Sequence, residues 1–286
     1  MKQDTSVPTV KTTHDKWNYI VFNLNAEGSI SADQNYTNQT GTASFSMNRT
    51  TDQTRFQIGT YGSKYIYTYK VKDSSGTQKY EVNNSDYSIF HFFVKSLGQH
   101  WSIGYAANLS NSTFQNTKTK WYFHPVLELN FFKYAEVNNR SFLLRYGADF
   151  SSFAYYDTTL YNKKKEDLFG QEVSLSINFN QKWGNFSSGA YYRNYFMNPG
   201  FYSTGANISF NIRITGGLSF YVSGTGNIIH DQVYLQKGGA TEQEVLLRKR
   251  QLASSFDYYT SLGINLRFGS KLNNFVNTRI SGYRAF

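Results

Sequence analysis

Apolar and polar residues alternate along most of this chain. In the stretch 205–214 the even positions run apolar from Ala206 to Ile214, while the odd positions hold Gly, Asn, Ser and Arg. The same alternation restarts at Leu218 and continues to Thr225. A period of two is typical of a β-strand with one apolar and one polar face.

Twelve segments are predicted as strands on this pattern. Many span about ten residues or more, whereas strands of globular sheets are nearer five or six. A strand needs about nine to eleven residues to cross the hydrocarbon layer of a membrane at a tilt. The predicted strands are 17–31, 40–49, 54–70, 80–96, 100–112, 118–132, 140–156, 170–181, 184–197, 201–214, 218–231 and 253–268.

The alternation is cleanest in the segments 118–132, 170–181 and 253–268. The segments 54–70 and 80–96 are less regular, because "YGSKYIYTYK" and "SIFHFFVK" carry aromatic residues on both faces. Bulky side chains on both faces would suit a packed interior or a contact with a partner barrel.

The connections between the strands differ in length. Those after even-numbered strands are short or moderate, whereas three after odd-numbered strands are long: 71–78, 157–169 and 231–252. Short turns at one rim and longer loops at the other are typical of outer-membrane barrels. The short "MNPG" connection departs from this rule. Within 231–252, Thr241 and Glu244 have the spacing of a helix capping box, which predicts a short helix.

An open sheet of twelve long strands would leave two edges without hydrogen-bonding partners. Closure satisfies every backbone group, which is obligatory in lipid. We therefore expect an all-β fold, a closed antiparallel transmembrane β-barrel of about twelve strands, rather than a soluble β-sandwich or soluble barrel. The barrel spans 17–268, between a periplasmic segment 1–16 and a periplasmic tail 269–286 that could enter the lumen. Aromatic residues near strand ends would form two interfacial girdles: Trp17, Trp101, Trp121, Tyr146, Tyr192, Phe196 and Phe268.

Composition agrees with this interpretation. Aromatic residues make up 18% of the chain, charged residues only 17%, and the mean hydropathy is −0.53. No segment approaches the ~18 consecutive apolar residues that a membrane-spanning helix needs. There is no cysteine, which excludes disulfides and cysteine metal sites. "MKQDTSVPTV" has no apolar core, so either the chain is cytosolic or its signal peptide has been removed. The barrel pattern favours the second, and with it a location in the bacterial outer membrane.

The formal net charge is +10, but the 29 Lys and Arg residues are spread along the chain and accompany no nucleic-acid-binding motif. Outer-membrane lipid and lipopolysaccharide are the expected partners of such scattered charge, rather than nucleic acid. Two basic clusters in the long loops would contact lipopolysaccharide phosphates, unless they are simply solvated. These clusters are Lys163, Lys164 and Lys165, and Arg248, Lys249 and Arg250.

The segment "EVLLRKRQLASSFDYYTSLGINLRFGSKLNNFVNTRI", residues 244–280, resembles the C-terminal end of outer-membrane β-barrel proteins from Bacteroidota. In these proteins the last strand ends in an aromatic-Gly-Ser step, here at Phe268, followed by an Asn-Asn-x-Val-Asn stretch. The resemblance extends over residues 85–280. It implies an outer-membrane barrel with no assigned activity. About eighteen residues follow Phe268, whereas many such barrels end at the aromatic residue of the last strand.

Charged residues of both signs are predicted on the inward face. They would form either a structural network that fills the barrel or the wall of a small polar or anion-preferring channel, with Arg193, Arg213 and Arg267 as its basic side. An accessory barrel within a larger outer-membrane complex is the alternative function, and a lipid hydrolase the third. The predicted lumen-lining residues are Arg145, Asp149, Glu172, Arg193, Arg213, Asp257, Arg267, His124 and Glu128.

No catalytic or metal site is expected, and no cofactor. The chain has five histidines and no Gly-x-Ser-x-Gly motif. His124 and Glu128 share a face of one strand, but four residues of strand separate them by about 13 Å, too far for a direct bond. A hydrolase would need a nucleophile beside an oriented histidine.

Overall fold

The computed structural model describes residues 15–73, 76–238 and 251–269. Its strands form one antiparallel sheet in which each strand pairs with its sequence neighbours, in the order β1 to β12. The prediction of an all-β fold with twelve antiparallel strands is confirmed. The strands are β1 Ile20–Ala32, β2 Tyr36–Thr50, β3 Thr54–Asp73, β4 Gly76–Ser96, β5 Trp101–Ser112, β6 Thr117–Asn130, β7 Arg140–Tyr155, β8 Lys165–Gln181, β9 Gly184–Tyr195, β10 Asn198–Arg213, β11 Leu218–Ile229 and β12 Phe256–Leu266.

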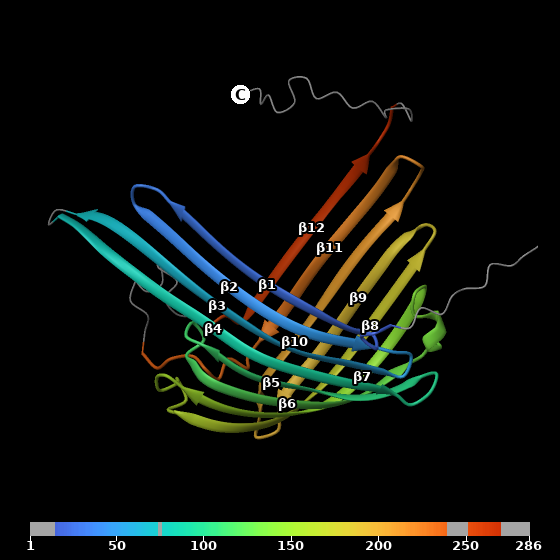
Figure 1. The fold of residues 1–286 in the computed structure, drawn as a ribbon, viewed down its shortest axis with the longest axis horizontal. Coiled ribbons are helices and arrows are strands. Elements are labelled where there is room, and N and C mark those ends of the chain that lie inside the picture. Colours follow the sequence, from blue (N-terminus) through green and yellow to red (C-terminus); the bar gives the residue numbers. More distant parts are fainter. Residues whose placement is uncertain (1–14, 74–75, 239–250, 270–286) are drawn as a thin grey trace, which may run out of the picture.

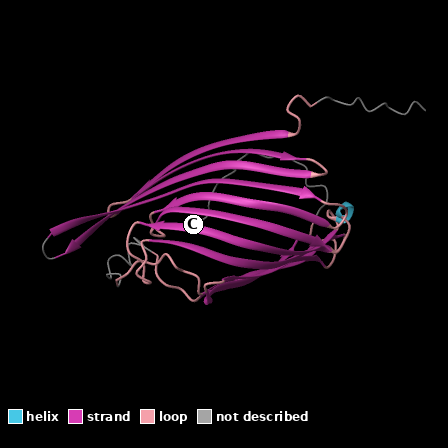
Figure 2. Cartoon of the chain, turned by 90° about the horizontal axis from the view of Figure 1, so that it is seen from below, coloured by secondary structure: helices cyan, strands magenta, loops and turns pink. Residues whose placement is uncertain are grey.

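The sheet curls strongly, with β1 and β12 as its two edges (Figure 1). The connections gather at the two ends of the strands (Figure 2). We call the end where β1 begins and β12 finishes the terminal rim, and the opposite end the loop rim. The longest connections at the loop rim are 156–164 and 230–255, and the longest at the terminal rim is 131–139, which contains the 3-10 helix η1, Tyr134–Glu136.

The predicted closure of the barrel is not shown. Within the described residues β1 pairs only with β2, and β12 pairs only with β11. Both edge strands are exposed along almost their whole length, on both faces. Each therefore presents one row of backbone groups without a strand partner, which is the condition that closure would remove.

Strand register assigns every side chain to one of two faces. We define the inner face as the one that carries Asp149 and is covered by the segment 230–237. Among the described residues other than glycine, twelve buried ones are polar or charged and seven are apolar, whereas exposed large apolar side chains occur on nearly every strand. The usual distribution in a soluble domain is the reverse. The outer face is therefore apolar and the inner face polar.

Outward aromatic residues lie near both rims. Trp101, Phe131 and Trp183 lie at the terminal rim, and Tyr156 and Phe196 at the loop rim, all with exposed side chains. Trp121 and Tyr192 lie within strands close to the loop rim, whereas Trp17 and Phe268 lie beyond the ends of β1 and β12. Tyr146 lies in the middle of β7, opposite Val173, so its predicted place at a strand end is wrong.

Two connections differ from the expected loops. Most of the predicted loop 71–78 is strand, because β3 and β4 continue as a long hairpin paired as far as Asp73 and Gly76. β8 begins at Lys165, inside the predicted loop 157–169. The predicted helix at 241–252 and the predicted tail 269–286 lie almost wholly outside the described residues. No helix in the described part of the chain is long and apolar enough to span a membrane.

The turn between β8 and β9 depends on a glycine. Gly184 has a φ of 144°, and a Cβ atom there would clash with the carbonyl oxygen of Asn211 on β10. Replacing Gly184 by Ala should therefore lower the free energy of unfolding by at least ~1 kcal/mol. Urea unfolding followed by tryptophan fluorescence would measure this. Gly41→Ala in β2 is the control, since nothing lies within 4 Å of its added Cβ; equal effects of the two substitutions would contradict the prediction.

Candidate functional site

A buried carboxylate organises the inner face of β6, β7 and β9. The side chain of Asp149 on β7 is completely buried. Its Oδ1 accepts a hydrogen bond from Tyr122 Oη at 2.9 Å and lies 2.6 Å from His124 Nδ1. Its Oδ2 lies 2.7 Å from Arg193 Nε. Four side chains from three strands therefore form one cluster, which we call the Asp149 cluster.

The cations of this region also lie against aromatic rings. The guanidinium of Arg193 lies 5.6 Å from the ring centre of Tyr122 and 5.4 Å from that of Tyr195. The ammonium of Lys120 lies over the rings of Tyr122 and Phe153, at 5.6 and 5.1 Å. Cation–π contacts of this kind gain strength where water is excluded. They hold both cations against the wall rather than free in the interior.

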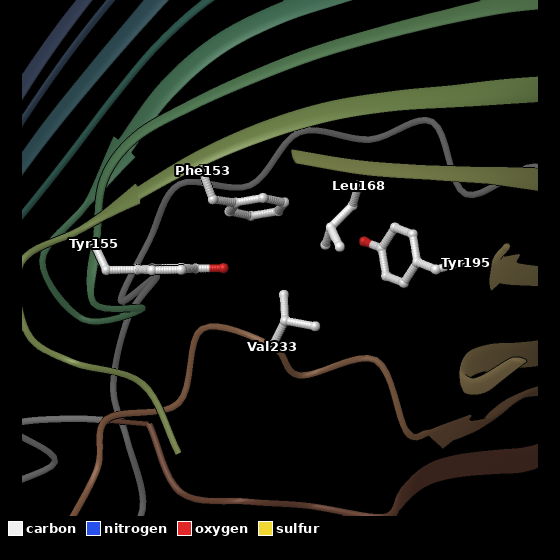
Figure 3. Close-up of a cluster of buried hydrophobic side chains, with 5 residues drawn as sticks. All are labelled: Phe153, Tyr155, Leu168, Tyr195 and Val233. Carbon is white, nitrogen blue, oxygen red and sulfur yellow. The ribbon is translucent and has the colours of Figure 1, made fainter. Parts of the chain in front are cut away.

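Apolar side chains pack beside the Asp149 cluster, toward the loop rim. Phe153, Tyr155, Leu168 and Tyr195 come from β7, β8 and β9 and surround Val233, which enters from the connection after β11 (Figure 3). Tyr155 Oη donates a 2.6 Å hydrogen bond to Glu166 Oε1. This is the main packed core of the described chain, and it fills the interior on the side of β7 to β9.

The loop-rim connections cover this core. The segment 230–237 runs beside 156–160, with Thr159 bridged to Gln236 and Leu160 N donating to Leu235 O. Asn116, in the β5–β6 turn, ties both segments together: its Nδ2 donates to Asp157 O at 3.0 Å and to Tyr234 O at 3.1 Å. Burial raises the pKa of Tyr234, so its phenol stays neutral at physiological pH. We call these segments the cap.

A second ionic group lies closer to the terminal rim. Arg145 Nε lies 2.6 Å from Glu128 Oε2 across β6 and β7. Tyr134 of η1 reaches toward it, with its Oη 3.5 Å from Glu128 Oε1 and 3.4 Å from Ser102 Oγ. The inner face thus carries two paired charge groups at different heights.

The structure brings together several of the predicted lumen-lining residues. His124, Asp149 and Arg193 form the Asp149 cluster, Glu172 lies opposite Arg193 in the register of β8 and β9, and Glu128 pairs with Arg145. All nine predicted residues lie on the parity of the inner face. That they line an open lumen stays a prediction.

The three arginines expected to form one basic wall do not share a height. Arg193 lies opposite Ser203, and Arg213 is roughly 33 Å farther along β10 at about 3.3 Å per residue. Arg213 and Arg267 are exposed near the terminal rim, where Arg267 N donates to Gly217 O. Asp257 instead accepts a hydrogen bond from Asn227, on the neighbouring strand. Arg193 is therefore separated from the other two and paired with Asp149.

The basic loop clusters are only partly described. Lys163 and Lys164 are exposed at the loop rim, and Lys164 Nζ donates to Tyr156 O at 3.2 Å. Lys165 is the first residue of β8. Arg248, Lys249 and Arg250 lie outside the described residues.

Five residues of the cluster and its surroundings were not predicted from the sequence: Tyr122, Lys120, Tyr155, Glu166 and Tyr195. Their inward parity can be read from the sequence. Which of them contact each other across strands also depends on the strand register, which the sequence does not give. His124 and Glu128 illustrate the point, because each takes its partner from β7 and not from its own strand.

The His124–Asp149 pair has the geometry of a histidine oriented by a carboxylate. Within the described residues no side chain hydrogen-bonds the other ring nitrogen of His124, and its ring lies against Gly147. A nucleophile beside the histidine is therefore not found in this part of the chain. The described residues also contain no group of three or more His, Asp or Glu suited to a metal ion. That the protein is not an enzyme stays a prediction.

Comparison with known proteins gives little. No family model and no curated protein matches the chain. A solved structure of the NanC porin aligns with 86% of this chain and 100% of its own, at 11% identity and a TM-score of 0.38. This likeness is too weak to carry an argument.

The Asp149 cluster should contribute strongly to stability. Asp149→Asn leaves the Arg193 charge buried without its counter-ion, so we expect the free energy of unfolding to fall by about 3–5 kcal/mol. Urea unfolding in detergent would measure the loss. Asp167→Asn, at an exposed outward position of β8, is the matched control and should change little.

The double variant Asp149→Asn/Arg193→Met removes both charges and should recover part of the loss. An Asp149→Asn protein as stable as the control would show that the cluster does not support the fold.

Proposed function

We propose that this chain is an integral outer-membrane β-barrel that acts as a narrow channel for small polar solutes. The observation that carries the proposal is the inverted distribution of side chains. Apolar residues cover the outer face of twelve long strands, and polar and paired charged residues occupy the inner face. An outward apolar band, aromatic residues near both rims and a polar interior are the features of transmembrane barrels.

Closure of the sheet is part of the proposal. Because the sheet has an even number of antiparallel strands, β1 and β12 run antiparallel to each other. Residues with even numbers face outward on both strands. We propose the like-face register that aligns the loop-rim ends of the two strands, Ala32 with Phe256. It places Ile30 opposite Tyr258 and Leu24 opposite Ile264. Pairing in this register would satisfy the two rows of backbone groups that lipid cannot accept. It would also complete the apolar band, because these four residues are among the most exposed large apolar side chains.

The Asp149 cluster and the cap support a narrow channel rather than a wide pore. They fill the interior on the side of β6 to β9. β1 begins and β12 finishes at the terminal rim, which we assign to the periplasm, so that the loop rim faces the cell exterior. There Lys163, Lys164 and Lys165 would contact lipopolysaccharide phosphates. The same role is proposed for Arg248, Lys249 and Arg250, which lie outside the described residues.

Weak anion preference is expected from Arg213 and Arg267. Both are exposed near the terminal rim, and within the described residues neither has an acidic partner. Arg193 adds no preference, because Asp149 neutralises it. An accessory barrel in a larger complex is the second candidate, favoured by the same filling of the interior.

The closure register can be tested by disulfide formation. The chain has no native cysteine, so paired substitutions report directly. Two cysteine pairs test the proposed register: Leu24→Cys/Ile264→Cys at an outward pair and Asn25→Cys/Gly263→Cys at the neighbouring inward pair. At least one of them should form a disulfide readily in cell membranes.

The control pair Leu24→Cys/Tyr258→Cys would lie roughly 20 Å apart and should stay reduced. Gel mobility with and without reductant measures the cross-link. Cross-linking of the control but of neither test pair would refute the register, and links between two chains would refute closure.

The channel can be tested in a planar bilayer. Purified protein should give stable conductance steps, and a salt gradient should give a reversal potential on the anion side. Arg213→Gln/Arg267→Gln should bring that potential close to zero by removing the exposed rim charges. Lys64→Gln, on the outer face of β3, should leave it unchanged.

A folded protein that gives no conductance would overturn the channel. If a second protein then remained bound through purification, the accessory role would replace it.

A further inference from the structure

A second feature of the inner face lies away from the Asp149 cluster, on the side of β2 to β5. A cavity of about 740 Å³ opens there toward the loop rim. Six tyrosines line it: Tyr36 of β2, Tyr61, Tyr65, Tyr67 and Tyr69 of β3, and Tyr87 of β4. The register places the tyrosines of β2 and β3 on the inner face, since Tyr36 lies opposite Tyr69 and the β3 tyrosines share one parity, whereas Tyr87 has the outward parity of β4. Ligand cavities in proteins commonly have about this volume.

The rings of Tyr36, Tyr65, Tyr67 and Tyr69 lie next to one another in a row. The rings of Tyr65 and Tyr67 are nearly parallel, at 3° and 6.4 Å between their centres. Tyr36 continues the row, 6.5 Å from Tyr67 and 5.1 Å from Tyr69. Tyr65, Tyr67 and Tyr69 are each only half-buried, so part of each side chain remains accessible. The row therefore presents several partly exposed aromatic rings to the cavity.

Polar groups form the adjoining wall, on the strands next to β3. Asn84, Asp86 and Ser88 come from β4, and Ser110 and Gln115 from β5 and the turn that follows. Asp86 accepts a hydrogen bond from Ser63 Oγ at 3.4 Å. This wall supplies hydroxyl, amide and carboxylate groups a short distance from the aromatic row. A ligand that contacts both groups must present a flat C–H-rich face to the tyrosines and hydroxyl groups to the polar side chains beside them.

We propose that this cavity binds a saccharide, as a short chain of neutral sugar rings. The C–H face of a pyranose ring stacks on an aromatic face, while its equatorial hydroxyls donate to carboxylates and amides. The spacing of the tyrosine rings is close to the length of one sugar unit, so successive rings can stack on successive tyrosines. An apolar ligand would leave the polar wall without partners, at a cost for each desolvated group.

The charges of the cavity disfavour a nucleotide, the other ligand that stacks on aromatic rings. Asp86 would repel a phosphate, and the cation that lines the cavity, Lys120, is engaged with the rings of Tyr122 and Phe153. The saccharide site goes beyond the proposed channel, because binding at equilibrium requires no conduction.

The test is titration of the purified full chain, in a detergent without sugar groups, with maltotriose and with cellotriose. Isothermal calorimetry and tyrosine fluorescence should both report saturable binding of at least one. Tyr65→Leu/Tyr67→Leu should weaken it roughly tenfold or more, because two stacking faces are lost. Tyr65→Phe/Tyr67→Phe keeps the faces and should stay within about threefold of the unmodified chain.

Tyr146→Leu/Tyr192→Leu, at outward positions, is the matched control and should bind as the unmodified chain does. The proposal would be overturned if neither trisaccharide bound saturably. It would also be overturned if adenosine monophosphate bound more tightly than both trisaccharides. An equal loss of trisaccharide affinity in the control variant would also overturn the proposal, because it would mean that general destabilisation causes the loss. Conductance steps in a bilayer without sugar binding would retain the channel and reject this site.

Discussion

The rest of this structure depends on the hydrogen-bond ladder between neighbouring strands. Each strand pairs with its sequence neighbours in a register that holds over its length, with small shifts near Thr117 and Asn198. Because side chains alternate along a strand, the register decides which residues face inward. A slip by one residue on β7 would turn Asp149 to the apolar outer face. The same ladder leaves one row of backbone groups on β1 and one on β12 without hydrogen-bonding partners. Because lipid cannot satisfy these groups, closure is expected there.

Within this frame, burial of charge organises the interior. Asp149 is fully buried, hydrogen-bonded by Tyr122 and in ionic contact with His124 and Arg193. These contacts offset the free-energy cost of burying a charge. Val233 and its neighbours then close over this cluster from the loop rim. The interior is thus filled on the side of β6 to β9 and hollow on the side of β2 to β5. This asymmetry connects the two proposals: the filled side narrows the passage, and the hollow side offers the tyrosine surface to a solute.

The strand register explains the composition of β3, one of the two strands with a less regular alternation. The expectation that "YGSKYIYTYK" carries aromatic residues on both faces is wrong, because Tyr61, Tyr65, Tyr67 and Tyr69 share one parity. Tyrosine is both aromatic and polar, so hydropathy alone cannot assign its face. The register with β2 and β4 makes the assignment, placing Tyr65, Tyr67 and Tyr69 inward beside Asp86 and Ser63. A tyrosine-rich inner face is compatible with a wet interior, since each phenol can hydrogen-bond water or solute.

The sequence by itself determined the strands and their two faces. Period-two alternation is a local property, so it predicted twelve strands, the antiparallel meander and the inward parity of residues such as Asp149, Arg193 and Glu128. The tertiary structure decided which of these residues meet: His124 with Asp149 and not with Glu128, Arg193 apart from Arg213, and Val233 inserted among side chains of β7 to β9. These contacts join residues far apart in the chain. They depend on register, on curvature and on the path of a long connection, and local periodicity contains none of the three.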